Sequence, residues 1–307
     1  MRLLWIAAHI ALAALSLVYW DVYLLKTFLD TPAPVLLLLT AIFTVILGLR
    51  ALAREFRPAE RGWLARRWAA LDGRALLYVG LFLILAAIQY YAYMRAASDG
   101  RAYFLMVRSL VMDWDVQFEQ DVATFGYNGG VLSYALGTPL LWIPFFLGAH
   151  VWLGVRNFFG ADYPMNGFFN PYQRASGFGS LILGMVALVV IDRLLRRYFS
   201  PRLATFSTLA VATGGWLAWF MAVDASWSHA TSALSVALFV SYWDATRKGR
   251  TRRQWATFGL LGGFMILVRW QNIFFAVFPL FDACGEYLRI RGQPGLDAVV
   301  QRLRTHI

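Results

Sequence analysis

Long apolar runs constrain the fold of this chain more than any other feature of its sequence. A helix needs roughly 20 apolar residues to cross the hydrocarbon core of a bilayer. Runs of about that length lie at about 3–25, 34–53, 75–97, 176–194, 203–223 and 228–245, and two less regular stretches cover about 132–154 and 255–288. We therefore expect an all-α, polytopic transmembrane helical bundle with about eight spans.

The composition indicates the same class of protein. Hydrophobic residues make up 60% of the 307 positions and charged residues only 15%, whereas soluble domains average about 45–50% and about 25%. These values exclude a disordered chain, a disulfide scaffold and most soluble enzymes. The net charge of +11 would suggest nucleic acid in a soluble protein. In a membrane protein, arginines collect on cytoplasmic loops, so we expect no nucleic-acid partner.

The arginines also predict which helix ends are cytoplasmic. The loop after the second run carries Arg54, Arg57, Arg61, Arg66, Arg67 and Arg74. Residues 1–74 are therefore interpreted as an N-terminal two-helix transmembrane extension with a basic cytoplasmic loop, and 289–307 as a basic cytoplasmic tail. This arrangement predicts a multi-pass protein of the inner (cytoplasmic) membrane with its N-terminus in the cytoplasm.

An external loop is expected at 98–175, within a core at 75–288. Its first part is acidic, with Asp99, Asp113, Asp115, Glu119 and Asp121 against Arg101 and Arg108. If 132–154 crossed the membrane, the basic residues between Arg193 and Arg202 would lie outside, against the charge rule. Because Pro139 and Pro144 also interrupt this stretch, we expect a broken interfacial or re-entrant helix there. The same rule predicts that 255–288 is a hairpin turning at Arg269–Asn272.

Polar residues at the external ends of the predicted helices define a candidate site. They are Asp99, Tyr172–Arg174, Asp224, Ser226, Ser228, His229 and Arg269–Asn272. Ionisable groups at membrane depth are energetically costly and are by default functional candidates. Carboxylates, a histidine and two arginines on one surface can hold an anionic head group beside a general base.

At these residues the chain resembles the integral-membrane GT-C glycosyltransferases that use polyprenyl-phosphate-linked sugars, in a bacterial branch related to protein mannosyltransferases and aminoarabinose transferases. The resemblance covers about residues 75–282. It rests on Ser98–Tyr103, Arg108–Leu110, Asp113–Trp114–Asp115, Thr138–His150, Tyr172–Arg174, Ser226–Ala230 and Leu267–Asn272. Family members also place interfacial helices in this external loop. Two features depart from the family pattern, namely the two spans before the core and the short length, which leaves room for a partner membrane subunit.

The resemblance implies an inverting transfer of a sugar from a polyprenyl-phosphate donor to an envelope acceptor on the external, periplasmic face. Asp99 would be the general base, with Asp115 and His229 as further catalytic candidates. The substrate- and phosphate-binding candidates are Arg269, Arg174, Gln271, Asn272, Asp224 and Tyr103. The arginines suit a leaving phosphate because a guanidinium presents its donors as a fork.

No cofactor is expected to be required, and the acceptor is a glycan, a lipid or a protein. If a divalent cation binds, the oxygen ligands would come from Asp113 and Asp115, with Glu119 and Asp121 nearby. Two alternatives stay open. One is a transporter or flippase for a lipid-linked substrate, in which the same charges would line a pathway. The other is a non-catalytic assembly subunit that retains the fold, in which Asp99 is an interfacial acid at a helix end.

Overall fold

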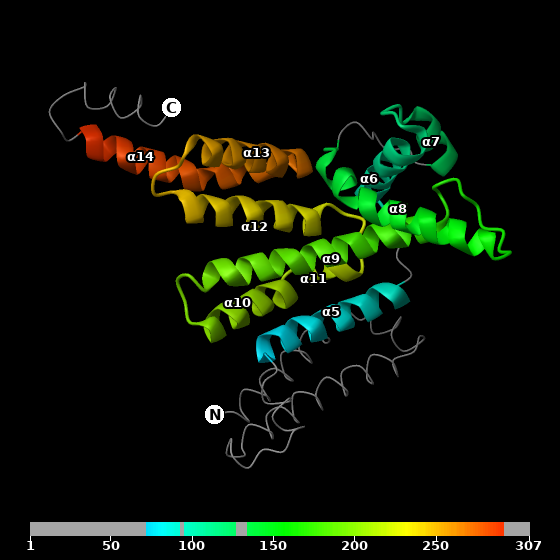
Figure 1. Cartoon of the computed structure of the whole chain (residues 1–307), viewed down its shortest axis with the longest axis horizontal. Helices are drawn as coiled ribbons and strands as arrows, with labels where there is room; N and C mark the ends of the chain where they lie inside the picture. Colours follow the sequence, from blue (N-terminus) through cyan, green and yellow to red (C-terminus); the bar gives the residue numbers. More distant parts are fainter. Residues whose placement is uncertain (1–71, 93–94, 127–133, 292–307) are drawn as a thin grey trace, which may run out of the picture.

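A computed structural model of the chain describes residues 72–92, 95–126 and 134–291 (Figure 1). The predicted spans at 3–25 and 34–53, most of the basic loop and most of the tail at 289–307 lie outside the described residues. The described residues form helices and no strand, which confirms the all-α class for this part of the chain. In chain order the elements are α5 (Gly73–Tyr91), α6 (Asp99–Arg108), η2 (Ser109–Asp113), α7 (Glu119–Phe125), α8 (Gly137–Phe158), α9 (Asn170–Leu195), α10 (Pro201–Gly214), α11 (Leu217–Ala222), α12 (His229–Thr246), α13 (Arg252–Val268), η4 (Trp270–Ala276) and α14 (Val277–Arg291).

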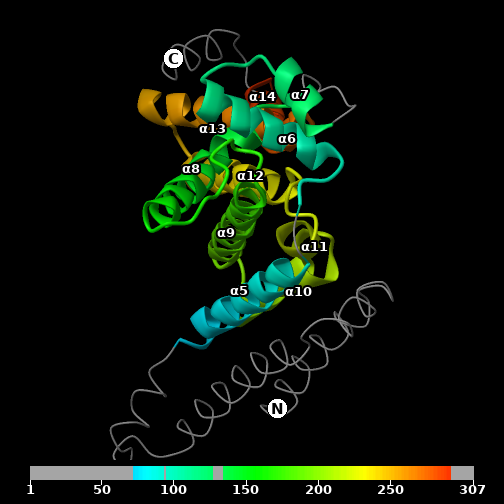
Figure 2. The same cartoon turned by 90° about the vertical axis from the view of Figure 1, so that its right-hand side faces the viewer.

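Helix α9 lies at the centre of the bundle. Figure 1 shows α12 and α13 on one side of it and α10, α11 and α5 on the other, and α9 contacts α12, α8, α10, α11 and α5. The first turns of α9 and α12 and the last turns of α5 and α13 meet at one end of the bundle, which we call the site end. Figure 2 looks onto this end, where α6 and α7 lie in front of the longer helices. The opposite end, which we call the basic end, carries Arg197 in an ion pair with Asp244.

Three helices in the described part of the chain are long and apolar enough to cross a membrane. They are Gly73–Tyr90, Gly137–Phe158 and Asn170–Leu195. A span of roughly 20 residues matches the hydrocarbon thickness of a bilayer. These helices support association with a membrane, while the total of eight spans stays a prediction.

The single span predicted at 203–223 is wrong, because this run forms two helices. Helix α10 starts with Ser200 as its N-cap, whose hydroxyl accepts from the amide of Leu203, and it ends at the pair Gly214–Gly215. Gly215 is extended, with φ −107° and ψ −177°. Glycine weakens a helix interior because it gives the backbone more conformational freedom than any other residue. The short helix α11 then takes a new direction (Figure 1).

The broken helix predicted at 132–154 is also different in the structure. The segment from Gly137 to Phe158 is one continuous helix that contains Pro144. Pro144 lies on the exposed face, where the carbonyl freed by the missing proline N–H is open to solvent or lipid head groups. The first half of α8 packs beside α9, since the indole of Trp142 donates to Ser180 at 3.0 Å. The interfacial position of α8 stays a prediction.

The start of α8 touches the end of α13 without any space for a side chain. A Cβ atom on Gly137 would lie 2.5 Å from the backbone nitrogen of Val268. Beside it, the hydroxyls of Thr138 and Thr231 are 2.7 Å apart and join α8 to α12. Small residues allow this kind of close helix approach. The contact fixes the start of α8 to the hairpin at the site end.

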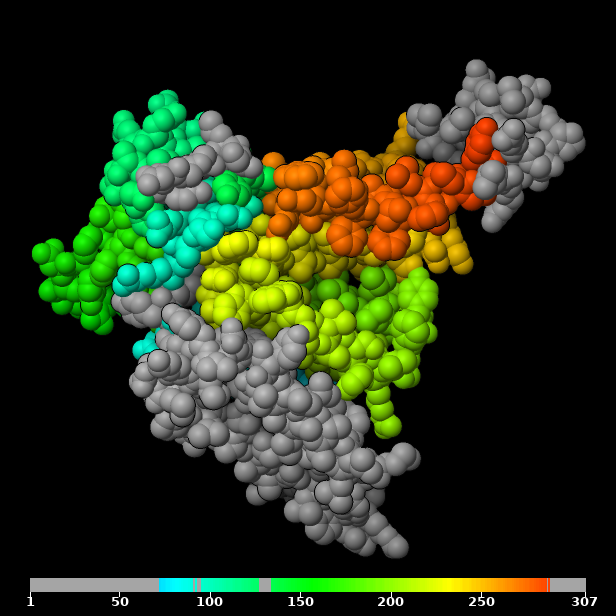
Figure 3. All heavy atoms as spheres, turned by 180° about the vertical axis from the view of Figure 1, so that it is seen from behind, coloured from blue at the N-terminus to red at the C-terminus, as the bar shows by residue number. Residues whose placement is uncertain are grey.

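The hairpin predicted for 255–288 is confirmed. Helix α13 ends at Val268, the 3-10 segment η4 makes the turn, and α14 runs back, so that the ring of Phe278 lies 5.5 Å from that of Trp243 on α12. Figure 3 shows α14, in orange, lying along α12, in yellow. The start of α13 is closed by a capping box between Thr251 and Gln254. Such a box satisfies amide groups that a helix start leaves unpaired.

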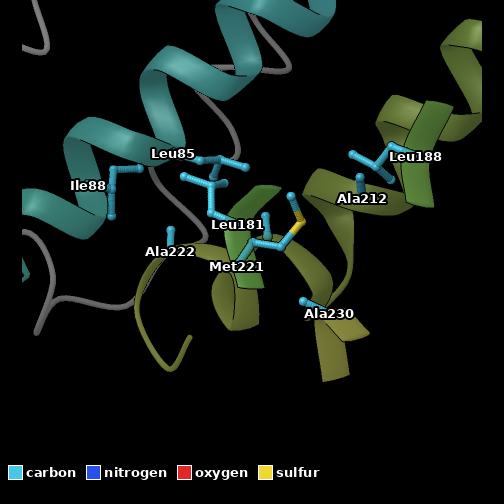
Figure 4. Packing of buried hydrophobic residues seen from close by; sticks show 9 residues of the cluster. Leu85, Ile88, Leu181, Leu188, Ala212, Met221, Ala222 and Ala230 are labelled. Atoms are coloured by element: carbon cyan, nitrogen blue, oxygen red, sulfur yellow. The ribbon is translucent and has the colours of Figure 1, made fainter. Parts of the chain in front are cut away.

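Close packing between α5, α9 and α11 forms the core below the site end. Leu85 and Ile88 of α5 face Leu181 of α9 and Met221 of α11 (Figure 4). The side chain of Met221 fills the space above Gly184, where a Cβ atom would approach its Cγ to 2.7 Å. Apolar side chains gain little by leaving lipid, so van der Waals packing of this kind stabilises helix association in membranes.

Candidate functional site

Polar side chains from four separate parts of the chain meet at the site end. They are Asp99 and Tyr103 of α6, Tyr134 before α8, Ser228 and His229 at the start of α12, and Arg269 and Gln271 at the hairpin turn. We call this group the Asp99–Arg269 site. Figure 3 shows the segment around the start of α6, in cyan, against the start of α12, in yellow.

The backbone that presents Asp99 is strained. Ser98, just before it, has φ 47° and ψ −128°, a combination that residues other than glycine rarely adopt. The next residue, Gly100, packs directly against Ser226, because a Cβ atom there would lie 2.0 Å from the Ser226 hydroxyl. Local strain of this kind costs about 1–3 kcal/mol and is concentrated at functional sites. The fold therefore holds Asp99 at a defined position beside the α11–α12 turn.

Asp99 is half-buried and accepts hydrogen bonds from two hydroxyls. The phenol of Tyr134 donates to its Oδ1 at 3.0 Å, and Ser98 donates to the same atom at 3.3 Å. Tyr134 also packs edge-on against Tyr103, with ring centroids 5.3 Å apart. These contacts orient the carboxylate and leave its Oδ2 without a hydrogen bond to the described residues.

Arg269 is held by neutral partners. Its Nη1 lies 2.9 Å from Nδ1 of His229, and its Nε donates to the amide oxygen of Gln271 at 3.2 Å. Because a guanidinium can only donate, the ring nitrogen facing it must accept. His229 is itself stacked on Phe220, with centroids 3.8 Å apart, and on Trp227. Within the described ranges no carboxylate forms an ion pair with Arg269, so its positive charge stays available for an anion.

Tyr103 joins the two halves of the site. Its side chain is only 5% exposed, and burial is the main reason that the pKa of its phenol is raised. The charge of Asp99 raises this pKa further, while the nearby Ser228 hydroxyl and the charge of Arg269 oppose the shift. The phenol therefore stays protonated at neutral pH and can act as a hydrogen-bond donor.

Three of the predicted binding residues have other contacts. Asn272 is buried, donates to the carbonyl of Met265 at 3.0 Å and accepts from Ser232 at 2.8 Å, so it fastens the turn to α12. Asp224 accepts from the indole of Trp219 at 2.7 Å, within its own turn. Arg174 donates to the carbonyl of Tyr90 at 3.1 Å and lies over the Tyr90 ring, which ties α9 to α5. The structure gives these side chains roles in positioning helices.

The acidic loop forms a second, separate cluster at the other end of α6. Arg108 makes ion pairs with both Asp113 and Asp121, and the hydroxyl of Ser109 donates to Asp115 at 2.7 Å. The bonds from Ser109 and from the amide of Gln117 lower the pKa of Asp115. A catalytic role shared with Asp99 would require Asp115 to lie beside Asp99. Asp115 instead lies in this second cluster.

Asp121 is the buried member of the acidic cluster. It is 2% exposed, and its Oδ2 has no hydrogen-bond partner. Burial raises its pKa to about 6, against the opposing charge of Arg108. Glu119, in the first turn of α7, is exposed. Among the described residues no group of three or more His, Cys, Asp or Glu side chains is arranged to hold a metal ion, and Oδ2 of Asp113 is ion-paired with Arg108.

Sequence reasoning missed Tyr134. It lies in an apolar stretch that was treated as a helix, and its bond to Asp99 joins residues 35 positions apart. No local pattern reports such a contact. The grouping of Asp99, His229, Arg269 and Gln271 was expected from the placement of loops on one face, and the structure brings these residues together.

Comparisons of the chain with family models, with curated proteins and with solved structures find no match.

Proposed function

We propose that the chain is an integral-membrane glycosyltransferase that moves a sugar from a polyprenyl-phosphate donor to an envelope acceptor on the non-cytoplasmic face. The observation that carries this proposal is that one site holds both an oriented carboxylate, Asp99, and a cation, Arg269, that has only neutral partners. The site lies at the end of helices that are long and apolar enough to cross a membrane. The proposal includes an inner-membrane bundle of about eight spans.

In this proposal Asp99 acts as the general base. The acceptor hydroxyl attacks the anomeric carbon while its proton passes to Asp99 Oδ2, because an alcohol is a poor nucleophile until its proton is being removed. A carbon–oxygen bond forms at the anomeric carbon as the bond to the phosphate oxygen breaks on the opposite face. The configuration of the sugar is thereby inverted, and the lipid phosphate leaves with the electron pair.

Arg269 and Tyr103 would stabilise the leaving group. Negative charge grows on the bridging phosphate oxygen during the reaction, and donors already aimed at that position stabilise it without reorganising. Arg269 has this preorganisation, since Gln271 and His229 fix its guanidinium from two sides. The protonated phenol of Tyr103 can add a hydrogen bond to a phosphate or sugar oxygen. Tyr134 would act as a positioning residue for Asp99.

The test is a mass-spectrometric profile of envelope glycans and lipid-linked sugars in a deletion strain. The strain is rescued by wild type, by Asp99→Asn or by Asp162→Asn, a matched change at an exposed acid of the same external loop. We expect wild type and Asp162→Asn to restore a lost glycan, and Asp99→Asn to leave the lipid-linked donor accumulated, with activity reduced by about 10²–10⁴-fold. Full rescue by Asp99→Asn would overturn the proposal and favour the transporter or the assembly subunit.

A further inference from the structure

Trp114 occupies a position at which a tryptophan side chain does not stabilise the fold. Its side chain is 88% exposed, and its backbone is left-handed, with φ 61° and ψ 31°. The left-handed conformation costs about 1–2 kcal/mol for a residue with a Cβ atom, so glycine or asparagine usually occupies such a position after a helix. An exposed, strained aromatic residue therefore indicates a contact outside the chain.

The fold holds the backbone on both sides of Trp114. On one side, Asp113 is ion-paired with Arg108, whose guanidinium lies 4.5 Å above the ring of Phe168 and whose Nε donates to the carbonyl of Asn166 at 3.3 Å. On the other side, Asp115 Oδ1 accepts from Ser109 at 2.7 Å and from the Gln117 amide at 3.1 Å. The indole is thus presented on a fixed support.

The surroundings of the indole favour a neutral ligand rich in hydroxyl groups. Exposed acids and amides lie within six residues of it in the sequence, namely Asp113, Gln117, Glu119 and Gln120. Arg108, the basic residue nearest to Trp114 in the sequence, is neutralised by two aspartates. Anionic lipid surfaces attract basic segments and repel acidic ones. A sugar ring offers an apolar face for the indole and hydroxyls for the carboxylates, so it matches both properties of the loop.

We propose that Trp114 is a stacking platform for a hexose ring of a neutral glycan, with Asp113 and Asp115 accepting hydrogen bonds from its hydroxyls. This inference deepens and rests on the proposed function, because it assigns the loop to a glycan-bearing acceptor. Trp114 lies beyond the C-terminus of α6, whereas Asp99 starts the same helix. Ten residues of helix span about 15 Å, so an acceptor would extend over several sugar rings between the two ends.

Glycan binding is measured by saturation-transfer NMR with the full chain in nanodiscs of neutral phosphatidylcholine, using maltohexaose and mannohexaose as probes. All proteins carry Asp99→Asn, so that binding is measured without transfer of a sugar. We expect Trp114→Ala to weaken binding by about ten-fold, a loss equivalent to one stacked ring. Trp114→Phe should keep part of the affinity. Phe158→Ala, at an 84% exposed aromatic residue of α8, should leave it unchanged. Thermal unfolding of each variant in the same nanodiscs reports whether its fold is intact.

Three outcomes would overturn the inference. The first is equal binding by the Asp99→Asn protein with and without Trp114→Ala, and the second is no binding of either probe to the Asp99→Asn protein that keeps Trp114. The third is that the side chain at position 114 lies in the membrane. To measure this, a nitroxide spin label is attached to Trp114→Cys in a Cys284→Ala background, and the protein is placed in vesicles. A label that is more accessible to oxygen than to a water-soluble nickel chelate lies in the membrane. Trp114-dependent binding combined with full glycan rescue by Asp99→Asn would instead overturn the proposed transfer and keep the platform.

Discussion

The two ends of helix α6 lie in two polar clusters, and the arginine of one cluster has neutral partners whereas the arginine of the other is ion-paired. At its start, Arg269 faces the ring of His229 and the amide of Gln271, both neutral. At its end, Arg108 is ion-paired with Asp113 and Asp121. The first cation keeps its charge available for a ligand, and the second is fully compensated within the protein. The comparison teaches that the number of acids near an arginine does not by itself mark a reactive site, because at Arg108 two of these acids compensate the cation, whereas Arg269 has no carboxylate partner among the described residues.

Arg269→Gln should have a larger effect on transfer than the other single variants below, because it removes the cation that has no carboxylate partner among the described residues. We expect Arg269→Gln to lower transfer by about 10²–10³-fold, because a preorganised donor to the leaving phosphate is lost. Arg156→Gln is the control, since Arg156 is exposed and lies over the rings of Trp152 and Tyr163. Donor turnover in reconstituted vesicles measures both. Equal losses in the two variants would show that Arg269 has no special role.

Removing Arg108, the ion-paired arginine, should lower the stability of the fold more than the rate of transfer. Arg108→Gln leaves the buried carboxylate of Asp121 without its counter-charge, which typically destabilises by about 3–5 kcal/mol. We expect hydrogen exchange in residues 109–125 to accelerate while the α9 and α12 amides stay protected. The double variant Arg108→Gln/Asp121→Asn should recover most of the loss. If the double variant is as unstable as the single one, the ion pair does not explain the loop's stability.

A smaller effect is expected from the hydroxyl that orients Asp99. Tyr134→Phe keeps the ring against Tyr103 but removes the 3.0 Å bond to Asp99. One neutral-to-charged hydrogen bond contributes about 1.5 kcal/mol, or about ten-fold in transfer rate. Tyr163→Phe, which removes a hydroxyl from the segment between α8 and α9, provides the matched control. An unchanged rate in Tyr134→Phe would remove Tyr134 from the site.

An effect of similar size is expected from a change of pH. Burial raises the pKa of Asp121 to about 6, above its value in the unfolded chain of about 4. Between these values the folded protein binds a proton that the unfolded chain does not, so the free energy of unfolding should increase as pH falls from about 7 to about 5. Asp115, whose pKa is lowered, loses its contribution only below about pH 4.

We expect this rise to be of the order of 1–2 kcal/mol and to disappear in Asp121→Asn. Melting temperature in detergent, compared between pH 7 and pH 5, measures it. Asp162→Asn should retain the rise. A wild-type protein that loses stability steadily over this interval would contradict the raised pKa.

The helices and the hairpin were predictable because they depend on local patterns. Apolar runs of membrane length gave α5 and α9, and the charge rule gave the turn at Arg269–Asn272. Two predictions failed at residues that can either interrupt a helix or be tolerated in it, namely glycine and proline. Gly214–Gly215 broke a run that was expected to be continuous, and Pro144 left intact a helix that was expected to break. Helix α8 stays intact because Pro144 lies on its exposed face, and that face is set by the helices packed against the other side.

The sequence by itself determined the helical class, the apolar lengths and the ends of helices at which charged residues gather. These properties follow from the hydrogen-bonding needs of a backbone in lipid and from the cost of placing charge there. Only the tertiary structure decided which charges meet. Arg269 and His229 are 40 positions apart, and Tyr134 and Asp99 are 35 positions apart. Such pairs form because close helix contacts, such as Gly137 against Val268 and Gly100 against Ser226, fix the register of whole elements. No local pattern carries that information.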